Sequence, residues 1–126
     1  MLTVSLDFHG IIDKYPKLFR LLSNILFATG NKVYILTGHK DTLELRAQLN
    51  EFGIKYNEII SVIDYHEKLG TNIWYDYKNT PWIDGELWNK AKAELCEKYG
   101  VDLHVDDSEE YGQYFTGKTK YLLLKG

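Results

Sequence analysis

The sequence predicts an α/β fold in which helices cover both faces of a mainly parallel β-sheet. Short, β-prone apolar runs alternate along the chain with longer segments whose apolar residues recur at helical spacing. The short runs are almost continuously apolar, which is typical of strands buried on both faces. Strands that alternate with helices in this way lie parallel and are joined by right-handed crossovers. We therefore expect a three-layer, Rossmann-like sandwich.

The first expected strand, residues 2–6, is apolar and ends at Asp7. Gly10 suits the sharp exit from this strand. A helix is then expected from Pro16, which is tolerated in a first helical turn, to Gly30, which offers a C-terminal stop. Between them the following apolar residues recur at helical spacing: Leu18, Phe19, Leu22, Ile25 and Leu26.

The second and third strands are expected at residues 32–36 and 59–63. The third is a short β-branched run of the length typical of a buried strand. Between the two strands, Asp41 and Glu44 resemble a capping box that opens a helix, and this helix should end near Gly53.

Residues 65–84 mix aromatic and turn-forming residues without a clean period, so we expect an irregular connection that can include one helical turn. Asp84 then caps a helix that ends at Gly100. The last three expected elements are a strand, a short helical piece and a final strand, at residues 102–105, 109–115 and 120–124.

The composition limits the class of protein. At 126 residues with 44% hydrophobic content, the chain can bury one sizeable core, so we expect a single domain over residues 1–126. The net charge of −3 gives no broad excess of basic residues, so nucleic acid is not an expected partner. Cys96 is the sole cysteine, which excludes an internal disulfide and a cysteine-rich zinc site. Without a secretion signal or an apolar stretch near the roughly 20 residues that span a bilayer, a cytoplasmic protein is expected.

Three of the expected strands end in residues that suit one kind of chemistry: Asp7, Thr37-Gly38 and Asp106-Asp107. Ligands of open parallel sheets bind outside the carboxyl ends of the strands, so these residues should share one site. Three crowded aspartates raise one another's pKa unless a cation lies among them, and carboxylate oxygens suit Mg²⁺. A threonine hydroxyl and a glycine N–H beside such a metal can donate to phosphate oxygens.

The order of these segments resembles a known family. Residues 4–13 place a hydrophobic strand before Asp7-Phe8-His9-Gly10, residues 35–38 end in Thr37-Gly38, and residues 104–107 end in an acidic pair. In this order they resemble the first, second and fourth motifs of the haloacid dehalogenase-like (HAD) hydrolases, which are mostly magnesium-dependent phosphatases working through a phosphoaspartate. The third motif of that family is a lysine ahead of the acidic strand. Lys92 is our choice, and Lys90 fits nearly as well.

The resemblance implies a role for each matching residue. Asp7 would be the nucleophile and a metal ligand, Asp106 a second ligand, and Asp107 would assist directly or through water. Thr37 and Gly38 would bind the phosphoryl group, and Lys92 would neutralise Asp7 and the phosphate oxygens. His9 would offer its backbone carbonyl to the metal.

Two departures from the family pattern bear on turnover. His9 stands where these phosphatases carry a second aspartate, the general acid and base. An imidazole, with an ordinary pKa near ~6.5, can fill that role. Without a carboxylate, however, the phosphoaspartate could persist, which would favour transfer or plain phosphate binding. The second departure is the cap, since neither the Asp13–Pro16 interval nor residues 37–92 leave room for a large cap domain.

The expected function is therefore a magnesium-dependent phosphatase that acts on a phosphorylated small molecule or on a nucleotide, in the second case as a nucleotidase. One alternative is a weakly active or inactive HAD-like domain that binds phosphate or metal and has an interaction or regulatory role. The other is a structural α/β domain. The aromatic residues Trp74, Tyr75, Tyr77 and Trp82 fit either a core or loop clamp or a surface on which a base or a sugar stacks. His39, His66 and His104 lack metal-ligand spacing and are expected to be structural or exposed.

Overall fold

A parallel sheet of five strands forms the centre of the computed structural model, which describes residues 1–125. The strand order is β3-β2-β1-β6-β7, and every neighbouring pair is parallel. The strands are β1 (Thr3–Leu6), β2 (Lys32–Thr37), β3 (Glu58–Ser61), β6 (Leu103–Asp106) and β7 (Lys120–Leu123). The α/β class and the parallel sheet expected from the alternation of strands and helices are confirmed.

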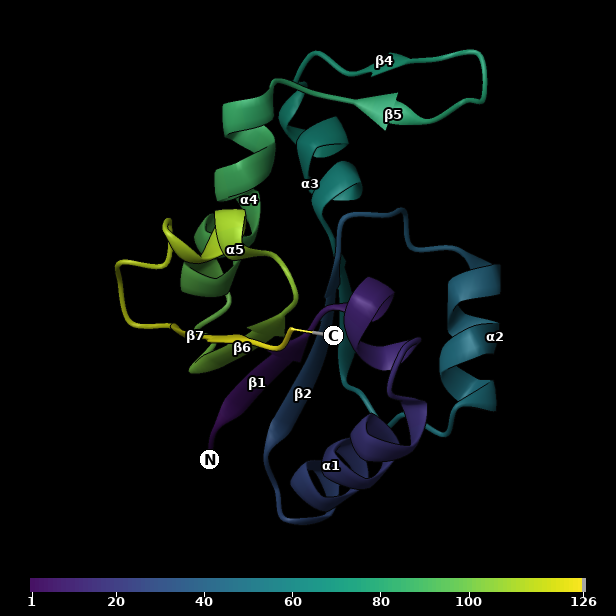
Figure 1. The fold of residues 1–126 in the computed structure, drawn as a ribbon, viewed down its shortest axis with the longest axis vertical. Helices are drawn as coiled ribbons and strands as arrows, with labels where there is room; N and C mark the ends of the chain where they lie inside the picture. The colour runs from purple at the N-terminus through teal and green to yellow at the C-terminus, as the bar shows by residue number, and fades with distance from the viewer. Residues whose placement is uncertain (126) are drawn as a thin grey trace.

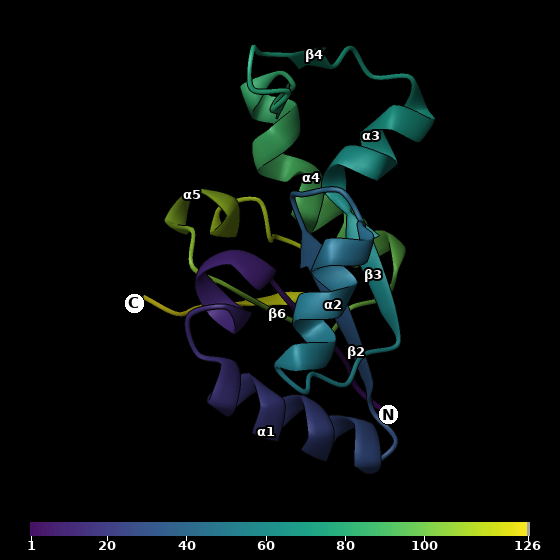
Figure 2. The ribbon, with the colours of Figure 1, turned by 90° about the vertical axis from the view of Figure 1, so that its right-hand side faces the viewer.

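Helices flank the sheet on both faces (Figure 1; Figure 2). Successive residues of a strand point to opposite faces, and β2 shows the consequence. Ile35 packs in one core cluster with residues of α1 (Pro16–Ala28) and α2 (Leu43–Glu51). Leu36 packs in the other with residues of α4 (Gly85–Lys98). The three layers therefore meet in two apolar cores, one on each face of the sheet.

The helix caps are local and mostly readable in the sequence. Asp84 caps α4 as expected, because its carboxylate accepts from the N–H groups of Glu86 and Leu87. The capping box proposed for α2 is wrong in its first residue. Thr42, not Asp41, is the cap, and its hydroxyl accepts from the N–H of Leu45 at 3.1 Å.

The segment after β3 is more regular than the sequence predicts. The strand stops at Ser61, whose hydroxyl accepts from the N–H of Asp64 at 3.1 Å and so opens α3 (Val62–Leu69). The prediction of a strand as far as residue 63 is wrong there. The irregular connection expected from residue 65 begins instead as the second half of α3, which continues to Leu69. After Gly70 the chain forms the hairpin of β4 (Trp74–Tyr75) and β5 (Pro81–Trp82).

The β4–β5 hairpin lies beyond α3 and α4 at one end of the molecule (Figure 1; Figure 2). Its turn is held by Asp76, whose carboxylate accepts from the N–H groups of Lys78 and Thr80 at 2.9 and 3.0 Å. The remaining helical pieces are the turn η1 (Phe8–Ile12) after β1 and the short α5 (Glu109–Gly112) before β7. Within residues 1–125, no helix has the length and apolar character needed to cross a membrane.

Candidate active site

The carboxyl ends of β1 and β6 bring Asp7 and Asp106 to one edge of the sheet, because these strands are neighbours. Lys92 reaches them from α4. Its Nζ lies 3.1 Å from Asp7 Oδ1 and 2.7 Å from Asp106 Oδ2. A buried ammonium group therefore bridges two carboxylates that lie far apart in the sequence but at the ends of neighbouring strands.

The two candidate lysines differ sharply in environment. The Lys92 side chain is 6% exposed, whereas that of Lys90 is 38% exposed and lies 3.8 Å from Glu94. Burial alone would lower the pKa of Lys92, but the charges of Asp7 and Asp106 outweigh it and raise the pKa. The geometry therefore places Lys92 in the site as a fixed positive charge.

A third carboxylate, that of Asp107, completes an acidic cluster. One ligand oxygen from each of Asp7, Asp106 and Asp107 lies within 4.8 Å of the others. Gly10 makes this close approach possible, since a Cβ there would lie 2.0 Å from Asp107 Oδ2, and its φ is +85°. Oxygen donors at this spacing fit a hard divalent cation such as Mg²⁺.

The electrostatics of the cluster also favour a cation. Burial, together with the charges of Asp106 and Asp107, outweighs the effect of Lys92 and raises the pKa of Asp7 to about 7. Burial and the neighbouring Asp106 likewise raise the pKa of Asp107. One lysine does not balance three carboxylates, so a bound cation would relieve the excess of negative charge.

We expect the metal-free protein to lose stability as the pH rises from about 4 to about 7. Folding raises the pKa of Asp7 from 3.8 to about 7, so between these values the folded protein binds a proton that the unfolded chain has released. At roughly 1.4 kcal/mol per pKa unit, the free energy of unfolding should fall by a few kcal/mol over this window. Urea unfolding in a chelator, at about pH 5 and pH 8, measures it. Asp7→Asn should flatten this dependence, and an equally steep fall in that variant would contradict the assignment to Asp7.

The end of β2 contributes a hydroxyl and a tight loop. Thr37 is fully buried and does not line the cavity that contains Asp7 and Lys92, whereas Gly38 does. The Oγ1 of Thr37 accepts from the N–H of His39 at 3.1 Å, so its hydroxyl proton stays free to donate. Gly38 follows it. A Cβ at this position would lie 2.7 Å from Cη2 of Trp88, so the indole packs directly on the loop after Thr37 and requires glycine there.

His9 lies at the mouth of the site. Its side chain is 54% exposed, and its Nδ1 is 3.3 Å from Asp13 Oδ2. Asp13 also accepts from the N–H of Gly10 at 2.7 Å, which ties the imidazole to the turn after β1. The rings of His9 and His39 are 4.3 Å apart between centroids. A cavity of about 280 Å³ is lined by His9 together with Asp7, Lys92 and Asp107.

His104 contacts the buried side of the site, where it hydrogen-bonds to Asp106. The sequence did not predict this contact. Its Nε2 lies 2.8 Å from Asp106 Oδ2, and its Nδ1 lies 2.6 Å from Ser5 Oγ. Burial lowers the pKa of His104 despite the neighbouring Asp106, which favours a neutral ring that donates from Nε2 and accepts from Ser5. Although burial opposes ionisation of Asp106, the hydrogen bond from His104 and the charge of Lys92 lower the pKa of Asp106 below its usual range.

We expect His104→Ala to destabilise the protein by about 2–4 kcal/mol. The change removes two buried hydrogen bonds and leaves a cavity in a fully buried position. Urea unfolding checks this value. His9→Ala is the matched control, because the same side chain is half exposed there and its loss should change stability by about 0.5 kcal/mol or less. Equal effects of the two substitutions would rule out the supporting role of His104.

The comparisons with known proteins add no family. No protein-family model matches the chain, and no curated protein is significantly similar to it in sequence. The resemblance to the HAD hydrolases therefore rests on the motif residues themselves, and membership in that family stays a prediction.

Proposed function

We propose that this protein is a magnesium-dependent phosphomonoester hydrolase that works through an aspartyl-phosphate on Asp7. The observation that carries the proposal is the bridge of Lys92 between Asp7 and Asp106 at the carboxyl edge of the sheet. This arrangement places a candidate carboxylate nucleophile, Asp7, a fixed positive charge, Lys92, and a second carboxylate, Asp107, around one cavity, with Asp106 buried behind Lys92. The resemblance of the strand-end motifs to those of HAD hydrolases supports the same assignment.

The acidic cluster would hold the metal. Asp7 and Asp106 are the candidate carboxylate ligands, with Asp107 binding directly or through water and His9 offering its backbone carbonyl. When bound, Mg²⁺ would neutralise charge on the phosphate oxygens and on the carboxylates. Thr37 and the Gly38 N–H would donate to the remaining phosphate oxygens, and Lys92 would stabilise the charge that develops during transfer.

The reaction would proceed in two displacements at phosphorus. In the first, a carboxylate oxygen of Asp7 attacks the phosphorus, the bond to the ester oxygen breaks, and the His9 imidazolium protonates the departing alcohol. In the second, neutral His9 takes a proton from a water molecule, which attacks the phosphorus and breaks the bond to Asp7. Inorganic phosphate and the original carboxylate result, and His9 has regained its proton.

A second candidate function is binding without turnover. The observation that favours it is the position of His9, whose side chain is half exposed and hydrogen-bonded to Asp13 rather than to a buried acid. If the imidazole cannot activate water, the site would bind phosphate and metal or hold the phosphoryl group on Asp7. The domain would then serve an interaction or regulatory role.

Hydrolysis of p-nitrophenyl phosphate with Mg²⁺ and with a chelator distinguishes these functions. The proposal expects steady release of nitrophenol that requires Mg²⁺. Thermal stabilisation by Mg²⁺ without steady release would support the binding domain instead. No release and no response to Mg²⁺ would contradict both functions and leave a structural α/β domain.

A further inference from the structure

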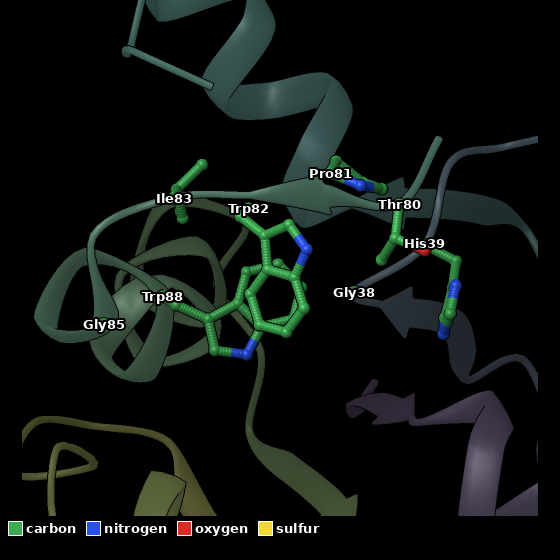
Figure 3. A pocket seen from close by; sticks show the side chains of 8 residues that line it. All are labelled: Gly38, His39, Thr80, Pro81, Trp82, Ile83, Gly85 and Trp88. Atoms are coloured by element: carbon green, nitrogen blue, oxygen red, sulfur yellow. The ribbon is translucent and has the colours of Figure 1, made fainter. Parts of the chain in front are cut away.

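A second cavity, of about 320 Å³, opens beside the candidate active site. Its walls come from β5, from the start of α4 and from the loop after β2. Figure 3 shows the indoles of Trp82 and Trp88 extending into it from β5 and α4, with Gly38 and His39 on another side. The cavity therefore presents two large aromatic side chains close to the proposed phosphate-binding loop.

The lining of this cavity suits a neutral planar ring. No lysine, arginine, aspartate or glutamate lines it, and His39 is the titratable residue of the lining. Tryptophan faces stack on planar rings of any heterocycle, and each stacked base contributes measurably to affinity. A phosphorylated sugar or acid alone would leave this surface unused.

The two cavities share a wall. Gly38, His39 and Trp88 line both the aromatic cavity and the cavity that contains Asp7 and Lys92. The indole of Trp88 packs on Gly38 at this boundary. A ring in the aromatic cavity is thus next to the proposed phosphate position, because the two cavities adjoin along these three residues. A ligand that fills both needs a short linker between ring and phosphate, and the sugar of a nucleotide is such a linker.

Both indoles are held in place before any ligand binds. The Nε1 of Trp82 donates to Asp76 Oδ2 at 3.1 Å, and that carboxylate also organises the hairpin turn. The Nε1 of Trp88 donates to the hydroxyl of Tyr111 at 2.9 Å. The Tyr111 ring lies 5.1 Å from Lys92 Nζ, so Trp88 is linked to the site lysine. Side chains fixed in this way lose little freedom when a ring binds between them.

We infer that the aromatic cavity binds the base of a nucleoside monophosphate whose phosphate lies at Asp7, Thr37 and Lys92. This inference rests on the proposed function and names its substrate class. Trp82 forms the outer wall of the base site and Trp88 the wall that faces the phosphate. The β4–β5 hairpin is then the part of the chain that selects the substrate.

Hydrolysis of adenosine 5′-monophosphate and of ribose 5-phosphate, which lacks only the base, tests the inference. We expect kcat/KM for the nucleotide to exceed that for the sugar phosphate by about tenfold or more, from stacking of one base. Trp82→Ala should reduce this ratio by at least about fivefold, and Trp82→Phe should restore most of it. A ratio near one in the unaltered protein would overturn the inference while leaving the phosphatase intact.

Tyr77→Ala is the matched control for stacking at the hairpin surface. Tyr77 is an aromatic residue of the same hairpin, is 91% exposed and does not line the cavity. The ratio should be the same in this variant as in the unaltered protein. A loss in Tyr77→Ala equal to that in Trp82→Ala would show non-specific stacking and contradict the base site.

Binding of adenosine, which carries no phosphate, separates this inference from the proposed function. Quenching of tryptophan fluorescence in Asp7→Asn measures it without any reaction. Saturable quenching supports the base site if the dissociation constant for adenosine rises at least about fivefold in the Asp7→Asn, Trp82→Ala double variant. This result would hold even if no phosphatase activity is found. Absence of saturable quenching, with hydrolysis of both phosphates intact, would overturn the base site alone.

Discussion

Asp7→Asn is expected to lower kcat for magnesium-dependent hydrolysis of p-nitrophenyl phosphate by on the order of 10⁴-fold or more. The asparagine side chain is neutral and is a poor nucleophile, so no phosphoaspartate forms. The substitution keeps the size of the side chain, and Lys92 keeps its contact with Asp106 at 2.7 Å. The loss would therefore reflect chemistry rather than a collapsed site.

Two further measurements make this result specific. Acid-quenched samples of the unaltered protein should carry one phosphoryl group by mass spectrometry, and Asp7→Asn should carry none. Asp41→Asn is the matched control, because Asp41 is an aspartate outside the cavity that pairs with Arg46 at 2.6 Å. Its rate should stay within about twofold. Retention of more than a tenth of the rate in Asp7→Asn would exclude Asp7 as the nucleophile.

The fold was predictable where the apolar residues recur at a single regular spacing. The helix after Pro16 and the helix capped by Asp84 were expected from spacing and caps, and both are present. The boundary at Ser61 was not, because Val62 and Ile63 are β-branched and continue the apolar run while their backbone already turns into a helix. The β propensity of these two residues is overridden by the helix cap that the Ser61 hydroxyl provides.

The β4–β5 hairpin was hidden for a different reason. Its strands have two residues each, so no alternation can develop. Its turn depends on the Asp76 carboxylate and on Asn79, whose φ is +61°. No regular spacing of residues in the sequence indicates these contacts. The aromatic residues of this segment stand out in the sequence, but only the structure shows that Trp82 is the one among them that lines the aromatic cavity together with Trp88.

The strand-end rule brought most of the candidate site together, and helix periodicity could have settled the rest. Along α4, the inward positions Ala91, Leu95 and Cys96 are buried, and Lys92 lies on the same stripe. A lysine on the apolar face of a helix is therefore the signal that favours Lys92 over Lys90. Similarly, His104 precedes Asp106 by two residues in one strand, so both point to the same face.

His9→Ala provides the last test, with an expected loss of about 10²-fold or more in kcat for p-nitrophenyl phosphate. Nitrophenolate is a good leaving group that needs little protonation, so the first displacement should survive. The second displacement needs a base to activate water. We therefore expect a burst of nitrophenol followed by slow turnover, with phosphoaspartate accumulating on Asp7. Stabilisation by Mg²⁺ should persist, since His9 is expected to contact the metal through its backbone.

Two companion variants show whether the imidazole itself does this work. His9→Asp restores the carboxylate of the HAD pattern. If histidine holds back the release of phosphate, this variant should turn over faster than the unaltered protein and accumulate less phosphoaspartate. His39→Ala removes the second imidazole, whose ring lies 4.3 Å from that of His9. Full turnover in His9→Ala combined with a burst and slow release in His39→Ala would assign the base to His39, since the two rings are close enough for either to reach the same water.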